Sequence, residues 1–128
     1  MQTLKDINKI LRGDFAASKN IEINNISIDS RTIEPGDLYI AIVGDNHDGH
    51  KFIADAKANG AVAAIVSMDP VIDIPHIQVA NTLDALTELA RHNREQFPIP
   101  AIAITGSCGK TTTRSFVGSI LTKHASAL

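Results

Sequence analysis

The chain has 128 residues, enough for one domain and a short additional segment. Hydrophobic residues make up 44% and charged residues 20%, proportions typical of a globular rather than a disordered protein. The formal net charge of −2 argues against a nucleic-acid-binding protein, which needs a dense basic surface. Apolar runs are too short to span a bilayer, and a single cysteine, Cys108, excludes an intramolecular disulfide. We therefore expect a cytoplasmic protein without membrane or nucleic-acid partners.

The first third of the chain predicts a helix followed by short strands. Apolar residues at helical spacing follow Thr3, a suitable N-cap, and Gly13 is expected to end the helix. The stretch 21–28 holds two isoleucine pairs that are out of phase across two asparagines. This pattern predicts either two short strands or one strand with a bulge. A Pro-Gly-Asp turn at 35–37 then leads into a buried strand over 38–43.

The middle of the chain alternates between helices and buried strands, which is typical of an α/β domain. We expect a polar loop over 44–49, a helix over 50–59, and strands at 61–66 and 77–79. A longer helix, capped by Asn81 or Thr82, is expected to follow, with an Arg91–Glu95 pair on its solvent-exposed side. We place the domain boundary at the proline-bearing segment 97–100, where a new unit begins. The four phenylalanines are assigned to the core: Phe15, Phe52, Phe97 and Phe116.

The segment 105–112, Thr-Gly-Ser-Cys-Gly-Lys-Thr-Thr, follows an apolar strand at 101–104 and precedes a helix-compatible run toward His124. Backbone amides of a glycine loop at a helix start converge on one point and bind phosphate. Lys110 is predicted to contact the β- and γ-phosphates as the catalytic residue, and the Thr111 hydroxyl to ligate Mg²⁺. The predicted ATP-binding residues are Gly106, Ser107, Cys108, Gly109, Lys110, Thr111 and Thr112.

The loop is shorter than the general phosphate-loop pattern, which would place a glycine where Ile104 stands. This short form resembles the ATP loop of the Mur ligase superfamily. Upstream features occur in the order and approximate spacing of that family's UDP-binding domain: Asp29-Ser30-Arg31, residues 35–41, Gly44, Asp48-Gly49-His50 with Phe52, and Gly60-Ala61. The resemblance covers essentially the whole chain.

The resemblance implies an α/β fold with two parts. Residues 1–97 would form the small amino-terminal domain that holds a UDP-muramyl substrate. Residues 98–128 would supply the first strand, phosphate loop and helix of a truncated central ATP-binding domain. The family's further motifs lie downstream of Leu128, so the chain by itself is expected to be an inactive fragment.

The resemblance also implies a reaction, namely ATP-driven amide formation through an acyl phosphate in peptidoglycan precursor synthesis. Residues 105–107, Thr-Gly-Ser, are similar to the branch of the family that adds D-alanyl-D-alanine to UDP-N-acetylmuramoyl-tripeptide. The branch that adds the third amino acid is the alternative. The implied cofactors are ATP and Mg²⁺, and the implied partners are the UDP-N-acetylmuramoyl peptide and D-alanyl-D-alanine. At full length the enzyme is expected to be monomeric.

Five residues are predicted to bind the substrate: Ser30, Arg31, Gly44, Asp48 and His50. A serine hydroxyl and an arginine fork suit a uracil edge or a diphosphate. The residues alone also fit an Asx or Ser turn with a solvated arginine, and a simple aspartate cap before His50. A metal site at His47 and His50 is disfavoured because the sequence places no third ligand nearby.

Two other functions fit parts of the pattern. A small P-loop NTPase would need the loop alone, but no further acidic motif follows Thr113. A non-catalytic module that binds a UDP substrate would need residues 1–97 alone.

Overall fold

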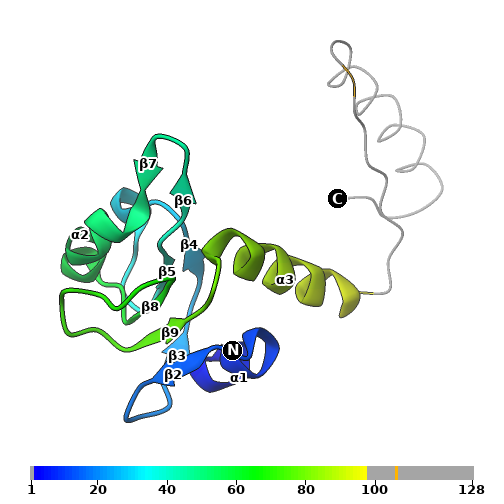
Figure 1. Ribbon diagram of the computed structural model, residues 1–128. Helices are drawn as coiled ribbons and strands as arrows, with labels where there is room; N and C mark the ends of the chain where they lie inside the picture. The colour runs from blue at the N-terminus through cyan, green and yellow to red at the C-terminus, as the bar shows by residue number, and fades with distance from the viewer. Residues whose placement is uncertain (1, 98–105, 107–128) are drawn as a thin grey trace, which may run out of the picture. The chain divides into compact units, whose positions relative to one another are not determined.

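The computed structural model describes residues 2–97 and residue 106 (Figure 1). Contacts between Cα atoms divide the chain into two units, 1–97 and 98–128. The strand expected at 101–104, the phosphate loop apart from Gly106, and the helix expected after it lie outside the described residues. Phe116 lies outside them as well.

A five-stranded sheet in the order β2-β9-β8-β5-β4 runs through the first unit. Its strands are β2 (Asp14–Ala16), β4 (Ile26–Ser27), β5 (Leu38–Ile40), β8 (Ala63–Val66) and β9 (His76–Gln78). Within this sheet, strands β4, β5, β8 and β9 are parallel, and β2 pairs with β9 in antiparallel orientation. The expected α/β class is therefore confirmed, with a mixed sheet.

Helices and short turns connect the strands of this sheet. The described helices are α1 (Leu4–Leu11), α2 (Ile53–Asn59) and α3 (Thr82–Glu95), with single 3₁₀ turns η1 (Ser30–Thr32) and η2 (Gly49–Phe52). Two small antiparallel pairs complete the unit: β1 (Gln2–Thr3) with β3 (Glu22–Ile23), and β6 (Val43–Gly44) with β7 (His47–Asp48). Ile23 and Ile26 thus lie in separate strands, the first of the two expected alternatives, while Ile21 and Ile28 lie just outside those strands.

The side chains of β5 alternate between two packed layers, with α2 on one side of the sheet and α1 with α3 on the other (Figure 1). The cluster on the α1 and α3 side includes Leu4, Ile7, Leu38, Ile40 and Leu89. The cluster on the α2 side includes Tyr39, Ala41, Ile53 and Ala56. Burial of β5 on both faces is what a central parallel strand requires.

The predicted helix starts are confirmed by their capping bonds. Thr3 Oγ1 accepts a hydrogen bond from the Asp6 amide at the start of α1, and Asn81 Oδ1 accepts from two amides at the start of α3. The end of α1 differs from expectation, because Arg12 and not Gly13 adopts the left-handed conformation, with φ 54°. Gly13 instead lies against β9, where an added Cβ would collide with the Gln78 carbonyl oxygen.

The strand expected over 38–43 is shorter than predicted. It ends at Ile40, because the Ile42 amide turns back to the Ile40 carbonyl instead of a neighbouring strand. Val43 is exposed and begins a hairpin, so the expected polar loop over 44–49 contains strand pairing. The helix expected over 50–59 begins as the 3₁₀ turn η2 and becomes α-helical at Ile53.

Two of the phenylalanines assigned to the core are exposed, and that assignment was wrong. Phe15 is 37% exposed on β2, an edge strand that the sequence pattern did not predict. Phe97 is 53% exposed just beyond α3. The flanking strand β2 lacks an alternating apolar pattern, and its existence depends on pairing with β9.

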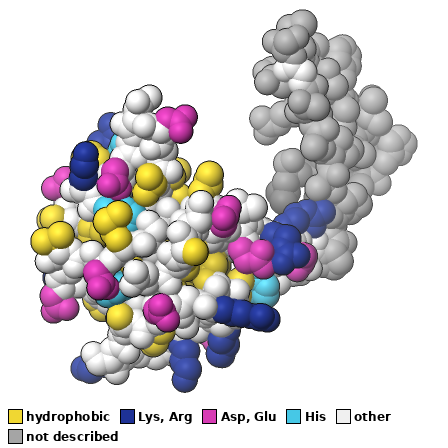
Figure 2. All heavy atoms as spheres, in the orientation of Figure 1, with side chains coloured by type: hydrophobic (Ala, Val, Ile, Leu, Met, Phe, Trp, Pro, Cys, Tyr) yellow, Lys and Arg dark blue, Asp and Glu magenta, His cyan; other side chains and the backbone are white. Residues whose placement is uncertain are grey.

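Charged side chains of both signs are interspersed on the face drawn in Figure 2. Over α3, Arg91 pairs with Glu88 at 2.6 Å and with Glu95 at 3.4 Å, so the predicted Arg91–Glu95 pair is confirmed. Among the described helices, none is long and apolar enough to cross a membrane.

The tight packing of Gly49 against the end of β5 gives a first prediction. A Cβ at Gly49 would lie 2.7 Å from the Ile42 nitrogen and 2.9 Å from the Ala41 carbonyl carbon. Both are backbone atoms, so relieving these contacts would require a shift of the main chain. We expect Gly49→Ala to reduce the free energy of unfolding by about 1–3 kcal/mol. Urea denaturation measures this difference.

Gly44 of the same hairpin region supplies the matched control. An added Cβ there would meet only the His47 carbonyl oxygen, at 3.9 Å. Gly44→Ala should therefore change the unfolding free energy by no more than about 0.5 kcal/mol. Equal effects of the two substitutions would show that backbone packing at Gly49 is not the determining contact.

Candidate functional site

A pocket of about 790 Å³ lies beside segments that follow the carboxyl ends of neighbouring parallel strands. Residues 28–31 follow β4, and the β6–β7 hairpin with η2 follows β5. Ligands of parallel α/β sheets bind outside the carboxyl ends of the strands, where such loops converge. The lining comprises residues 28–31 with Tyr39, His47, Phe52, Asp55, Ala58 and Asn59.

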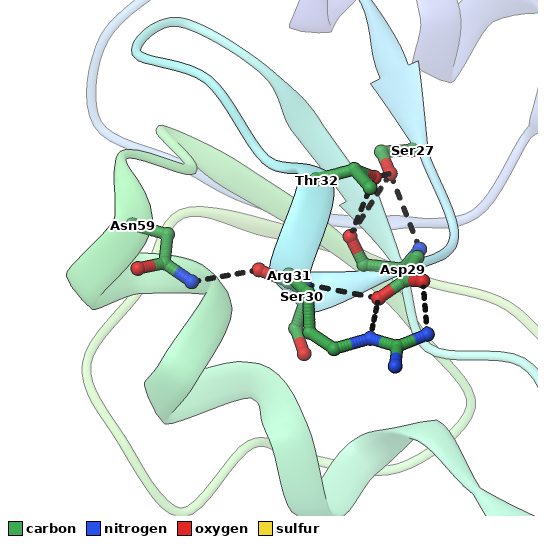
Figure 3. Close-up of polar contacts among 6 residues, drawn as sticks. All are labelled: Ser27, Asp29, Ser30, Arg31, Thr32 and Asn59. Atoms are coloured by element: carbon green, nitrogen blue, oxygen red, sulfur yellow. Dashed lines mark hydrogen bonds and ion pairs between the residues drawn. The ribbon is translucent and has the colours of Figure 1, made fainter.

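The turn that carries Ser30 is fixed on both sides (Figure 3). Before the turn, Ser27 Oγ accepts from the Asp29 amide at 3.1 Å. Within it, Asp29 Oδ1 accepts from the Arg31 amide at 3.0 Å, which is the Asx-type cap that the sequence allowed. From α2, Asn59 Nδ2 donates to the Ser30 carbonyl at 2.8 Å. These bonds give the turn one defined conformation before any ligand binds.

Arg31 folds back on the aspartate two residues before it. Its Nε donates to Asp29 Oδ1 at 2.9 Å and its Nη2 to Asp29 Oδ2 at 2.7 Å, a bidentate pair. The Arg31 guanidinium holds the pKa of Asp29 at about 2, well below the ordinary value of 3.8. The Arg31 side chain is 86% exposed, so the pair lies at the solvent-facing rim.

The Ser30 hydroxyl is the polar group best placed to receive a ligand. Ser30 is 8% exposed and lines the pocket. Its Oγ makes no hydrogen bond within residues 2–97, whereas its carbonyl is bound to Asn59 (Figure 3). A hydroxyl that can both donate and accept therefore faces the pocket without a competing partner.

Aromatic residues form another part of the pocket wall. The rings of His47 and Phe52 stack with their centroids 5.3 Å apart and an interplanar angle of 10°. Tyr39 is buried in β5, and its hydroxyl donates to the Gly49 carbonyl at 2.9 Å. Burial raises the pKa of Tyr39, so the phenol stays a neutral donor to this bond. The wall can thus offer a flat apolar surface to a planar ligand.

Of the five predicted substrate residues, the structure brings Ser30 and Arg31 into the pocket and leaves the other three outside its lining. Gly44 is exposed in β6 and pairs with His47. Asp48 caps η2 by accepting from the His50 amide at 3.0 Å, so the simple capping role is present.

His50 connects η2 to the end of β8. Its Nδ1 lies 2.8 Å from Asp48 Oδ1, and its Nε2 accepts from the Ser67 amide at 3.0 Å. A backbone amide can only donate, so Nε2 carries the lone pair and Nδ1 carries the proton that faces the carboxylate. The His50 hydrogen bond lowers the pKa of Asp48. His50 therefore joins two backbone segments behind the pocket.

The predicted substrate residues left out most of the lining, including Tyr39, His47, Phe52, Asp55 and Asn59. Tyr39 lies within a buried apolar run, and Phe52 is on the face of the 50–59 segment that was assigned to the core. Asp55 and Asn59 are four residues apart on α2, so helical spacing places them on one side. That spacing was the signal that could have identified them.

The described residues contain no group of three or more histidine, cysteine, aspartate or glutamate side chains that could hold a metal ion. Lys110, Thr111 and the other predicted ATP-binding residues lie outside the described part, except Gly106. Gly106 is exposed and has a φ of 153°, a backbone region that glycine tolerates best.

Comparison with known proteins indicates the same family as the resemblance of the loop. The family model described as "Mur ligase family, catalytic domain" matches residues 22–100. The chain belongs to the Mur ligase family. It is 36% identical over 126 residues to the UDP-N-acetylmuramoyl-tripeptide–D-alanyl-D-alanine ligase of Escherichia coli (strain K12), covering 98% of this chain and 28% of that ligase.

Solved structures of Mur ligases match the fold as well. MurF from Acinetobacter baumannii is 36% identical with a TM-score of 0.84, covering 95% of this chain and 28% of that protein. MurF from Thermotoga maritima in complex with ADP is 33% identical with a TM-score of 0.69, covering 79% and 24%. This Mur ligase chain thus spans about a quarter of the length of the relatives it matches.

The Asp29–Arg31 pair of this Mur ligase chain gives a second prediction. The folded-state pKa of Asp29, about 2, lies below the ordinary value of 3.8. The pair therefore stabilises the fold fully above pH 3.8, and this contribution is lost as the pH falls through about 2. Arg31→Gln should raise the pKa of Asp29 toward 3.8, measured by a carboxyl carbon NMR titration.

The Asp6–Lys9 pair on α1 is an internal control in the same titration. The Lys9 hydrogen bond also holds the pKa of Asp6 at about 2. Arg31→Gln should leave the Asp6 titration unchanged while moving that of Asp29. A pKa of Asp29 that stays near 2 without Arg31 would show that the turn amides, and not the guanidinium, stabilise the carboxylate.

Proposed function

We propose that this chain is the amino-terminal part of a ligase that adds D-alanyl-D-alanine to UDP-N-acetylmuramoyl-tripeptide in peptidoglycan synthesis. In this proposal residues 1–97 hold the UDP-muramyl substrate and residues 98–128 begin the ATP-binding domain. The single observation that carries the proposal is the unpartnered Ser30 hydroxyl beside Arg31, in a pocket at the carboxyl edge of a Mur ligase sheet.

The chemistry of the pocket wall suits the nucleotide part of such a substrate. The stacked rings of His47 and Phe52 give a surface for a pyrimidine base. The Asp55 carboxylate can accept from ribose hydroxyls, and Ser30 and Arg31 can donate to phosphate oxygens. Base, sugar and diphosphate each have a complementary group among the lining residues.

Three of the predicted substrate residues have a different role in the proposal. Asp48 and His50 support the pocket from behind, because their side chains bind each other and the Ser67 amide. Gly44 supports the exposed His47 through the β6–β7 pairing. Their effect on the substrate is therefore exerted through the position of the hairpin and η2.

The ATP-binding part of the proposal rests on the sequence of residues 105–112, on Gly106, and on the ADP complex of the Thermotoga maritima relative. Bound ATP would supply the phosphoryl group that activates the substrate carboxylate. Lys110 would hold the β- and γ-phosphates, and Thr111 would ligate Mg²⁺.

Substitution of Ser30 tests the pocket directly. We expect Ser30→Ala to weaken UDP binding about 3- to 10-fold, because one hydrogen bond contributes about 0.5–1.5 kcal/mol. The measurement is an NMR titration of the chain with UDP, in which amides of residues 28–31 and of α2 should shift. Ser18→Ala removes an exposed hydroxyl outside the lining and should leave the affinity unchanged.

The same titration separates the competing functions. Tighter binding of UDP-N-acetylmuramoyl-tripeptide than of the dipeptide form favours the D-alanyl-D-alanine branch, and the reverse order favours the branch that adds the third residue. Absence of shifts in residues 2–97 at saturating UDP would rule out the proposed pocket. Binding of MgATP in the low micromolar range without UDP binding would support a small P-loop NTPase instead.

A fourth prediction concerns the phosphate loop in the full-length enzyme that the proposal implies. Lys110→Ala should lower turnover by about 100-fold or more, by analogy with the loss of one preorganised charge donor. Lys123→Ala removes the same charge from the same segment outside the loop motif and should retain turnover. Equal turnover of the two variants would remove Lys110 from the catalytic assignment.

A further inference from the structure

The pocket has an unusual charge balance for a site that receives a diphosphate. Among the described lining residues, Arg31 is the one Lys or Arg side chain, and it is accompanied by the carboxylates of Asp29 and Asp55. A carboxylate beside an anion site repels the ligand if it acts only through its charge. Charge alone therefore does not explain why Asp29 lies next to Arg31.

The hydrogen bonds of Asp29 show that both oxygens of its carboxylate are bonded to Arg31. Oδ1 accepts from both the amide and the Nε of Arg31, and Oδ2 accepts from Nη2. The backbone of Asp29 is fixed as well, because its amide donates to Ser27 Oγ and its carbonyl accepts from Thr32 Oγ1. Both carboxylate oxygens are therefore already bonded to Arg31, and the backbone bonds fix the direction in which the carboxylate points.

The guanidinium, in contrast, keeps one group for a ligand. Nε and Nη2 face Asp29, while Nη1 points away from the carboxylate and makes no hydrogen bond within the described residues (Figure 3). An arginine side chain that is 86% exposed would otherwise sample many rotamers, and a ligand would have to order it on binding. The bidentate bond to Asp29 restricts that freedom before a ligand binds.

We infer that Asp29 is a positioning residue, which holds the Arg31 guanidinium at the pocket rim so that Nη1 is presented to the phosphates of the ligand. The inference rests on the proposed function, since it takes the ligand to be a nucleoside diphosphate. Asp29 itself does not contact the ligand. It contributes to diphosphate affinity through Arg31 and contributes nothing to recognition of the base and ribose.

The test compares UDP with uridine, because only UDP carries the group that Arg31 contacts. We expect Asp29→Asn to weaken UDP binding about fivefold and to leave uridine binding unchanged, measured by NMR titration of the full chain. The asparagine retains an Oδ1 that can cap the Arg31 amide, so the turn is preserved. If Asp29 acted only by repulsion, the same substitution would tighten UDP binding, and the inference would be overturned.

Two further variants separate positioning from a general loss of structure. Arg31→Lys keeps the charge but loses the bidentate fork, and it should weaken UDP binding without affecting uridine. In an Arg31→Gln background, Asp29→Asn should cause no additional loss. A loss that is the same for UDP and uridine would assign Asp29 a merely structural role and contradict the inference.

A charge control and the wild-type titration complete the design. Asp45→Asn removes a carboxylate from the exposed hairpin turn outside the lining and should leave both affinities unchanged. If the wild-type chain binds neither uridine nor UDP, the proposed function fails and the inference fails with it. If it binds both, and Asp29→Asn does not weaken UDP binding selectively, the inference alone is wrong.

Discussion

The backbone at the end of β5 is the constraint on which the rest of the unit depends. The Ala41 amide donates to the Ile65 carbonyl of β8, and the Ala41 carbonyl accepts from Thr82 Oγ1 of α3 at 2.8 Å. One residue later, the Ile42 carbonyl accepts from the Gly49 amide at the start of η2. Within two residues the chain is therefore bonded to the next strand, to a helix and to the turn that opens α2.

That junction also explains where the pocket lies. Because β5 stops at Ile40, the chain is free to form the β6–β7 hairpin, which carries His47 over the pocket, and then η2, which carries Phe52. The close approach of Gly49 to residues 41–42 fixes the start of η2. Tyr39 strengthens the same arrangement by donating to the Gly49 carbonyl from inside the core.

The elements that sequence reasoning predicted well are those whose signals are local. Thr3 and Asn81 act as helix caps through bonds to amides within three residues, so their own sequence neighbourhood contains the information. The buried strand ending at Val66 was identified because an apolar run of that length needs two covered faces. Local chemistry thus determines most of the helices and central strands.

The elements that sequence reasoning missed depend on distant partners. Strand β2 exists because Phe15 pairs with Ile77, 62 positions later in the chain, and its own residues are exposed. The hairpin at Val43 depends on Gly49 packing against the end of β5, which no periodicity in the segment reveals. Patterns within a short window cannot report such contacts.

The candidate site follows the same division between local and distant information. Ser30 and Arg31 were identified from one tripeptide, and their turn is indeed held by the neighbouring Asp29. The opposite wall comes from α2, whose Asn59 reaches the Ser30 carbonyl across 29 positions. Only the folded sheet brings these segments together, so the sequence could predict the turn that carries Ser30 and Arg31 but not the rest of the pocket lining.

The alternating side chains of β5 contribute both to the hydrophobic core and to this pocket. Leu38 and Ile40 pack toward α1 and α3, while Tyr39 between them packs toward α2 and lines the pocket. A shift of one residue in the pairing with β8 would send Tyr39 into the opposite layer, because successive side chains of a strand point to opposite faces. The hydroxyl would then lose the Gly49 carbonyl, and η2 would lose its anchor to the core. The register of three buried residues therefore determines both the hydrophobic layers and the wall of the candidate binding site.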